Sequence, residues 1–201
     1  MGGSPHMHFI QCDDVIEPAV ADEFERKMMS DQFPWQYYAN VNYSVPPPDG
    51  VRSKTLIHDE QRFQDSHGFS SVIFPGNEDT AWFTVPKLIL DSFSEKNGFR
   101  LERLLRVKAN LLVRSAVPNP RPFTPHVDMP KPHWAMIYYV NDSDGDTVIF
   151  DKMYSDPENA VVLHSISPKK GRAVMFDGRH YHSGTVPANH DARIVINFDF
   201  L

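Results

Sequence analysis

Apolar positions follow two different periods along the chain, and the change comes near residue 98. Before it, apolar residues recur at the three-to-four-residue spacing of helices. After it, short runs of β-branched and aromatic residues are separated by Pro, Gly, Asn and Asp. We therefore expect helices and loops over 7–98 that support a β-sheet core over 99–201.

Two amphipathic helices are predicted in the first part. Val20, Phe24 and Met28 recur every four residues, which predicts a helix from about Glu17 to Met29. A second helix is predicted over Pro86–Asn97. Pro86 is suited to the first helical turn, and Gly98 is suited to end the helix after Asn97.

Three shorter segments complete this part. The aromatic run from Phe33 to Tyr38 is expected to pack on the core. Three consecutive prolines predict a loop over Ser44 to Gly50. Ser70 to Phe74 has the pattern of a short strand that ends at a Pro-Gly turn.

The second part contains six runs that are typical of strands. Many short strands with turn residues between them indicate a sandwich or a double-sheet jelly roll. The runs are Arg103–Ser115, Trp134–Val140, Thr147–Phe150, Val161–His164, Arg172–Phe176 and Arg193–Phe200. The predicted fold is mainly β, a jelly roll buttressed by N-terminal helices.

Length and composition predict one soluble globular domain over 7–201. The 201 residues are 41% hydrophobic and 12% aromatic, and the single cysteine, Cys12, fits a reducing compartment. No apolar run approaches the ~20 residues of a membrane-spanning helix, and the start lacks a secretory pattern. We therefore expect a cytoplasmic protein. Residues 1–6 resemble an expression remnant, so we expect Met7 to be the native start.

The charge balance makes nucleic acid an unfavourable partner. The formal net charge is -6, whereas binding to phosphates needs a basic surface. One basic strip in the second part is expected to consist of solvated turn residues. It comprises Lys131, Lys169, Lys170, Arg172 and Arg179.

The candidate chemistry lies in His126-Val-Asp128, in His182, and in Arg193 eleven residues further on. Two imidazoles and one carboxylate leave open positions on a metal, which is the arrangement preferred by non-haem Fe(II) oxygenases. Arg193 is suited to hold the distal carboxylate of 2-oxoglutarate. With 10 His and 18 Asp in 201 residues, chance alone gives about one His-x-Asp, so the motif needs support from its context.

Strand geometry supports this grouping. Residues two apart in a strand point the same way, so His126 and Asp128 can reach one ion while Val127 packs behind them. His182 is the favoured third ligand, because the Ser-Gly that follows it leaves room for a co-substrate; His180 remains an alternative. The other histidines are expected to be surface or hydrogen-bonding residues, namely His133, His164 and His190, with His58 in an isolated His-Asp-Glu set aside.

Several blocks in a fixed order carry a resemblance to a known family. They are Arg106-Val-Lys-Ala-Asn110-Leu, His126-Val-Asp-Met-Pro130, Ile137-Tyr-Tyr-Val-Asn141, Asp144-Gly-Asp-Thr147-Val-Ile-Phe, Gly171-Arg-Ala-Val-Met-Phe-Asp-Gly178, His182-Ser-Gly and Arg193-Ile-Val-Ile-Asn197-Phe. The chain resembles the 2-oxoglutarate/Fe(II)-dependent dioxygenases of the prolyl 4-hydroxylase-like group over about 104–201. It is also similar to short marine phage and bacterial proteins of unassigned substrate.

The resemblance implies a double-stranded β-helix with Fe(II), 2-oxoglutarate as co-substrate and O2 as oxidant. His126, Asp128 and His182 would hold the iron, and Arg193 would pair bidentately with the 5-carboxylate of 2-oxoglutarate. Tyr139 matches a position that hydrogen-bonds the same carboxylate. The implied reaction is hydroxylation of a C–H bond with release of succinate and CO2, and a prolyl residue in a peptide or protein is the first candidate substrate.

Residues around these positions have weaker expectations. Thr147 and Asn197 are candidate pocket-lining residues. Lys108 and Asn110 have the opposite strand parity and are expected at the surface. Turn and surface roles are expected for two aspartates, Asp177 and Asp199.

The chain departs from the family at two places. Collagen-type enzymes have lysine where Arg193 stands, whereas arginine is usual in the oxygen-sensing branch. A tyrosine found about ten residues before the first histidine is absent, because Ala116 and Val117 stand there. Substrate contacts therefore do not transfer, and a peptide or a small molecule remains open as the substrate.

Three alternatives remain. A nucleic-acid demethylase of the same superfamily carries a second arginine six positions after the first, where this chain has Asp199. A non-catalytic jelly-roll module that binds a metal would keep the ligands without turnover. A zinc hydrolase would need a general base near the triad, and none is evident. The sequence does not indicate the oligomeric state.

Overall fold

The computed structural model describes residues 9–39, 41, 63–64, 67–117, 120–154 and 160–201. The loop predicted over Ser44–Gly50 and the isolated His58 lie outside these residues. Within them, no helix is both long and apolar enough to cross a membrane.

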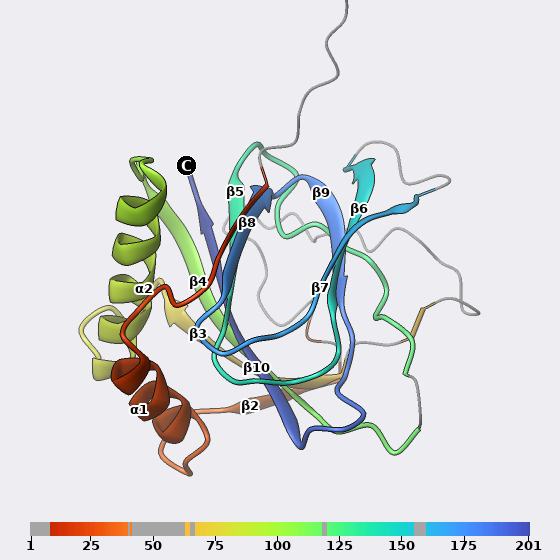
Figure 1. The fold of residues 1–201 in the computed structure, drawn as a ribbon, viewed down its shortest axis with the longest axis horizontal. Helices are drawn as coiled ribbons and strands as arrows, with labels where there is room; N and C mark the ends of the chain where they lie inside the picture. The colour runs from red at the N-terminus through yellow and green to blue at the C-terminus, as the bar shows by residue number, and fades with distance from the viewer. Residues whose placement is uncertain (1–8, 40, 42–62, 65–66, 118–119, 155–159) are drawn as a thin grey trace, which may run out of the picture.

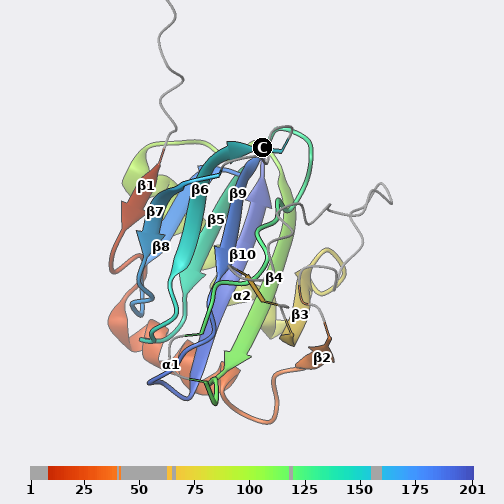
Figure 2. The same ribbon diagram turned by 90° about the vertical axis from the view of Figure 1, so that its right-hand side faces the viewer.

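Two antiparallel sheets face each other in the molecule (Figures 1 and 2). The larger has the strand order β1-β8-β5-β10-β4-β3-β2, and the smaller has the order β7-β6-β9. The strands are β1 (Ile10–Cys12), β2 (Gln36–Tyr38), β3 (Gly68–Phe74), β4 (Leu104–Val113), β5 (Trp134–Tyr139), β6 (Thr147–Met153), β7 (Val162–Ile166), β8 (Ala173–Asp177), β9 (His180–Gly184) and β10 (Ala192–Phe200). The prediction of a mainly β jelly roll with supporting helices is confirmed.

Both helices lie on the outer face of the larger sheet (Figure 1). Helix α1 (Pro18–Met28) agrees with its prediction to within one residue at each end. Helix α2 (Ala81–Asn97) begins five residues earlier than predicted, so Pro86 lies inside it. The extra turn carries Trp82, whose ring packs edge-on against Phe33 at 4.9 Å between centroids. Tertiary packing of this aromatic residue thus accounts for a start that proline chemistry alone does not predict.

Alternation along the central strands creates two separate cores. On β5, Met136 and Tyr138 face the helices, whereas Ile137 and Tyr139 face the smaller sheet. The helix-side core contains Met28, Phe93 and Phe198 among many others. The core between the sheets is smaller, with eight buried residues: Ala135, Ile137, Tyr139, Ile149, Ile166, Val174, Phe176 and Val195.

The six predicted strands of the second part are all present, with ends shifted by a few residues. Strand β3 extends the predicted Ser70–Phe74 run by two residues. Strand β9 was not predicted, because His-Tyr-His-Ser-Gly shows no alternation of apolar and polar residues and is instead buried at four consecutive positions. Its pairing with β6 forms only once the chain has folded back on itself.

Lys169 of the basic strip is exposed as expected, whereas the Arg172 side chain is only 18% exposed, which corrects the expectation for that residue. Arg172 donates through Nε to Asp13 at 2.7 Å, and Lys169 bonds the same carboxylate at 2.9 Å. Lys170 reaches two carboxylates of α1, Asp22 and Glu25. These ion pairs connect β1 and α1 to the turn before β8.

Candidate metal centre

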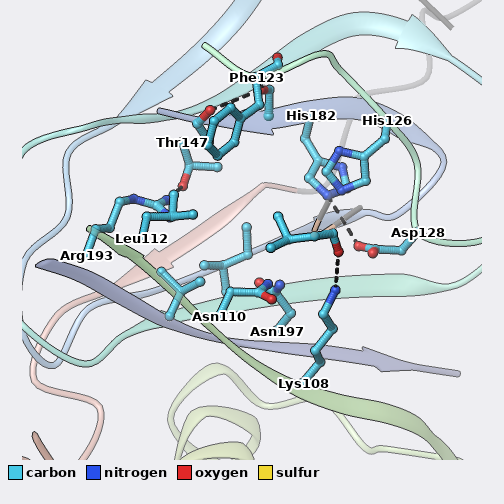
Figure 3. A pocket seen from close by; sticks show the side chains of 15 residues that line it. Lys108, Asn110, Leu112, Phe123, His126, Asp128, Thr147, His182, Arg193 and Asn197 are labelled. Carbon is cyan, nitrogen blue, oxygen red and sulfur yellow. Dashed lines mark hydrogen bonds and ion pairs between the residues drawn. The ribbon is translucent and has the colours of Figure 1, made fainter. Parts of the chain in front are cut away.

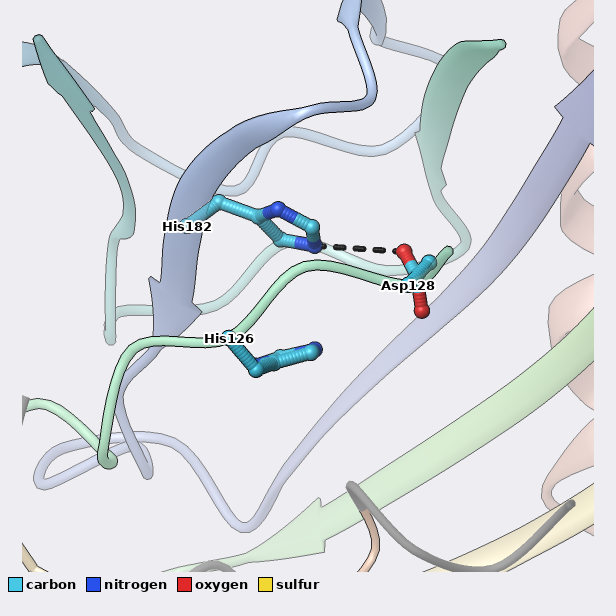
Figure 4. A group of neighbouring side chains, drawn as sticks. All are labelled: His126, Asp128 and His182. Atoms are coloured by element: carbon cyan, nitrogen blue, oxygen red, sulfur yellow. Dashed lines mark ion pairs between the residues drawn. The ribbon is translucent and has the colours of Figure 1, made fainter. Parts of the chain in front are cut away.

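Two histidines and an aspartate meet at one edge of the smaller sheet. His126 lies between β4 and β5, and its backbone exchanges hydrogen bonds of 3.0 and 2.9 Å with His182 on β9. Asp128 follows two residues later, and one ligand atom from each of the three lies within 4.8 Å of the others (Figure 4). Nε2 of His182 is 3.3 Å from Oδ2 of Asp128. Val127 is fully buried on the other side of the segment, as expected from alternation.

The protonation states of this triad, His126, Asp128 and His182, suit metal binding. Burial and the His182 charge lower the pKa of His126 to about 3, so its imidazole is neutral. Burial raises the pKa of Asp128, but Arg106 and His182 outweigh this and hold that pKa well below its usual range. Burial lowers the pKa of His182, but the hydrogen bond to Asp128, the Asp128 charge and the bond to the His180 backbone together outweigh this and raise the pKa. A metal ion takes the place of such a shared proton when it binds.

The two rings differ in how the protein holds them. Nδ1 of His182 donates to the carbonyl oxygen of His180 at 3.1 Å, which leaves Nε2 directed at Asp128. Nδ1 of His126 is buried and has no hydrogen-bond partner among the described residues. An unpaired buried nitrogen is costly unless a bound species satisfies it. The donor set and its spacing therefore fit a divalent first-row metal with open positions.

The competing histidines have other partners. His180 bonds the Phe150 carbonyl oxygen at 2.9 Å through Nδ1. His164 stacks on Phe9 with 4.1 Å between ring centroids, and His190 bonds Asp144 at 2.8 Å. Among the described residues, these histidines form no second cluster with metal-ligand spacing.

An ion-pair network that the sequence analysis missed holds the aspartate of the triad. Arg106 on β4 donates through Nη2 to Asp128 and through Nε to Asp199 at 2.6 Å. Asp199 is completely buried, which corrects its expected surface role, whereas Asp177 pairs with Arg179 at a turn. Burial raises the pKa of Asp199 against the pull of Arg106. Strand parity contained the signal, because residue 199 shares its face of β10 with residues 193 and 197.

A buried guanidinium, that of Arg193, lies in the cavity that the triad also lines (Figure 3). Arg193 is 4% exposed, and its Nη2 donates to Oγ1 of Thr147 at 2.6 Å. Tyr139 donates to the same oxygen at 2.7 Å from behind. Burial lowers the pKa of Arg193, and its Nε has no partner among the described residues. A buried guanidinium that forms no ion pair with a carboxylate of the described residues is suited to bind an anion bidentately.

The cavity joins the triad to Arg193. Including its open mouth it measures about 580 Å³. Its wall contains Val41, Lys108, Asn110, Leu112, Phe123, Ile137, Thr147, Ser183, Gly184, Val195 and Asn197 beside the triad and Arg193. The structure therefore brings the sequence-predicted residues into one site, with Tyr139 one layer behind Thr147.

Comparison with known proteins gives its result at the level of structure. No protein-family model matches the sequence, and no curated protein matches it. The non-haem α-ketoglutarate-dependent epimerase SnoN of nogalamycin biosynthesis is 10% identical, with a TM-score of 0.62 over 97% of this chain and 78% of that one. A 2OG-Fe(II) oxygenase family oxidoreductase from Burkholderia pseudomallei is 12% identical, with a TM-score of 0.57 over 96% and 84%. A Pseudomonas putida prolyl-4-hydroxylase is 14% identical, with a TM-score of 0.51 over 97% and 93%.

The chain has the fold of the 2-oxoglutarate and Fe(II) oxygenases. This confirms the double-stranded β-helix expected from the resemblance. At 10–14% identity the likeness establishes the fold, and the argument for the chemistry comes from the site.

The position of two residues of β4 differs from the expectation. Lys108 and Asn110 were expected at the surface, yet both line the cavity, and Lys108 is only 5% exposed. The antiparallel register places Lys108 opposite Asn197 and Asn110 opposite Val195, so these pairs share one face. Parity within one strand cannot show which residues of the next strand lie on the same face.

Two smaller details complete the cavity of this oxygenase fold. Gly184 lies against the Arg193 guanidinium, because a Cβ atom built on it would be in van der Waals contact with Nη1 of Arg193 at 3.4 Å. Two large aromatic side chains, Trp134 and Trp35, pack against the helix-side core and away from the cavity wall. The entrance is therefore not shaped by these two tryptophans.

Proposed function

We propose that the protein is a 2-oxoglutarate- and Fe(II)-dependent oxygenase that hydroxylates a C–H bond and releases succinate and CO2. One observation carries this proposal. The His126, Asp128 and His182 ligand atoms converge in the same cavity that holds Arg193, a buried guanidinium whose Nε has no partner among the described residues. A metal centre and an anion-binding guanidinium in one enclosed space are what a metal-chelating keto diacid requires.

The triad would hold the iron, with Arg106 as its support. Arg106 fixes Oδ1 of Asp128, and Oδ2 is left on the side of His182. Neutral His126 and the anchored ring of His182 present nitrogen lone pairs to the same point. When bound, Fe(II) supplies the O2 chemistry that oxidises a C–H bond, which no side chain here can provide.

Arg193 and Thr147 would hold the distal carboxylate of 2-oxoglutarate. The planar guanidinium fork donates two parallel hydrogen bonds to a carboxylate. Oγ1 of Thr147 accepts from both Arg193 and Tyr139, so the hydroxyl hydrogen of Thr147 is available to donate to the same carboxylate. Tyr139 therefore acts as a positioning residue, and Asn197 would line the pocket.

A prolyl residue in a peptide or protein is the first candidate substrate. Support comes from the sequence resemblance and from two structural neighbours, the Pseudomonas putida enzyme and a Trichoplax adhaerens prolyl hydroxylase in complex with a hypoxia inducible factor peptide fragment, 13% identical with a TM-score of 0.58. A small molecule is the other class of substrate, since SnoN has been crystallised with nogalamycin RO. The demethylase alternative has no comparable support. Asp199, which pairs with Arg106, stands where a demethylase carries its second arginine, and the net charge is -6.

The deciding experiment is succinate formation from 2-oxoglutarate, followed by NMR after anaerobic loading with Fe(II) and admission of air. We expect turnover by the wild type and its loss in His182→Ala and Arg193→Ala. The matched control is His190→Ala, whose imidazole is half exposed and bonds Asp144, and neither residue lines the cavity. Absence of succinate together with absence of metal-dependent 2-oxoglutarate binding would favour the non-catalytic metal-binding module instead.

A further inference from the structure

Lys108 is a second buried cation in the cavity, and the proposed chemistry does not use it. Its side chain leaves β4, and among the described residues Nζ donates one hydrogen bond, to the carbonyl oxygen of Val41 at 2.7 Å (Figure 3). An ammonium group has three donors, so a single bond to a neutral carbonyl leaves it largely unsatisfied. Burial lowers the pKa of Lys108 to about 7.

No described carboxylate is paired with Lys108. The two acidic groups that act on it, Asp128 and Asp199, are both bound by Arg106. A buried lysine without a counter-ion is rare, because removing an ammonium from water is costly unless a charge compensates it. Such a group is retained where a ligand supplies the missing charge.

The neighbours of Lys108 on the cavity wall are two amides. Asn197 faces it across the β4–β10 register, and Asn110 is two residues further along the same face. Oδ1 of Asn110 is buried without a hydrogen-bond partner among the described residues. One cation and two amides thus form a polar wall. Apart from the bond from Lys108 to Val41, their donors and acceptors remain, among the described residues, available to a ligand.

This wall lies at the opposite end of the cavity from Arg193. Along β4, Leu112 pairs with Arg193 and Lys108 pairs with Asn197. Four residues of a strand correspond to about 13 Å. This spacing is between backbone positions, and Figure 3 shows the Lys108 and Arg193 side chains on opposite sides of the cavity, which favours a molecule other than the co-substrate on Arg193 as the partner of Lys108.

We propose that Lys108, with Asn110 and Asn197, binds a carboxylate of the primary substrate. This inference rests on the proposed function and narrows it: the substrate is an acid whose carboxylate lies close to the carbon that is oxidised. Among prolyl substrates, it selects free L-proline or a C-terminal prolyl residue over a prolyl residue inside a chain.

The test uses the whole protein loaded with Mn(II), which stands in for Fe(II) without turnover. Calorimetry measures the Kd of 2-oxoglutarate first. It then measures the Kd of paired probes in the presence of saturating 2-oxoglutarate: L-proline against L-prolinamide, and alanyl-proline against its C-terminal amide. The variants are Lys108→Met, which removes the charge, Lys108→Arg, which keeps it, and Lys87→Met as a control on an exposed lysine of α2.

We expect at least one acid to bind the wild type about tenfold or more tightly than its amide. Lys108→Met should lose this preference, Lys108→Arg should keep part of it, and 2-oxoglutarate should bind all variants alike. Equal binding of acid and amide, or no binding of either acid, overturns the proposal. Weakened 2-oxoglutarate binding in Lys108→Met assigns the carboxylate to the co-substrate and also overturns it.

Two further measurements distinguish a binding role of Lys108 from a purely structural role, and a failure of this proposal from a failure of the proposed function. In the metal-free protein, Lys108→Met should raise Tm, because it removes an uncompensated buried charge at similar volume. A lowered Tm with acid binding intact would mean that Lys108 serves only its bond to Val41. If the wild type fails to bind 2-oxoglutarate with Mn(II), the proposed function fails, whereas a failure confined to the acid probes leaves it standing.

Discussion

At the scale of the residue, Arg106 connects two buried carboxylates, Asp128 and Asp199, and its own side chain is only 13% exposed. Without it, two like charges would remain in a poorly solvated space. We expect Arg106→Met to lower the free energy of unfolding by about 3–5 kcal/mol in urea titrations. The exposed Arg114→Met, which loses only a surface ion pair with Asp191, should change it little.

A second substitution checks this explanation at the same scale. In the Arg106→Met background, Asp199→Leu removes one of the two carboxylates, so part of the lost stability should return. Mn(II) should also stabilise Arg106→Met more than the wild type, because a cation bound by Asp128 replaces the lost positive charge. Additive losses in the double variant would contradict the network.

At the scale of the element, β1 is an edge strand that ion pairs attach to the sheet and to the turn before β8. The hydrogen bond from Arg172 lowers the pKa of Asp13 from its usual value of 3.8 to about 2, and Lys169 adds to this effect. A carboxylate with a depressed folded pKa stabilises the protein above its unfolded pKa, and this stabilisation is lost as the pH falls through the folded value.

We therefore expect the free energy of unfolding to differ between the wild type and Asp13→Asn by an amount that depends on pH. The difference should be constant above about pH 5 and shrink between 3.8 and about 2, as Asp13 becomes protonated. Its size should be about 1 kcal/mol, since the carboxylate is one-third exposed and solvent screens it. Urea unfolding at a series of pH values measures it, and a difference that grows toward acid pH would contradict the assignment.

At the scale of the whole molecule, the triad joins segments that are far apart in the sequence. His126 belongs to the connection between β4 and β5 of the larger sheet, and His182 belongs to β9 of the smaller sheet. A metal that binds both stabilises only the folded state. At a hundredfold excess over Kd, the gain is about 2.7 kcal/mol, which corresponds to about 5–10 °C in Tm for a chain of this length.

Chelation should reverse this shift. We expect Mn(II) to raise Tm by that amount, a chelator to restore the metal-free value, and His182→Ala to show no shift. His190→Ala should respond like the wild type, because its imidazole lies outside the cavity. A full shift in His182→Ala would mean that the metal binds elsewhere, and differential scanning fluorimetry distinguishes these outcomes.

The sequence by itself determined the features that depend on neighbours along the chain. Helix α1, the end of α2 at Gly98 and six strands of the second part follow from local periodicity and turn residues. The nomination of His126, Asp128, His182 and Arg193 followed from spacing and from the family resemblance. Strand parity also contained the burial of Asp199, although that signal was not used.

Tertiary structure decided everything that depends on how strands pair. The β4–β10 register turned Lys108 and Asn110 into the cavity, and the closure of the smaller sheet formed β9 and placed His182 beside His126. Packing of Trp82 on Phe33 set the start of α2. The physical reason is common to all three: local periodicity records which faces are apolar, whereas the partner of each face is selected by long-range contacts that only the folded chain makes.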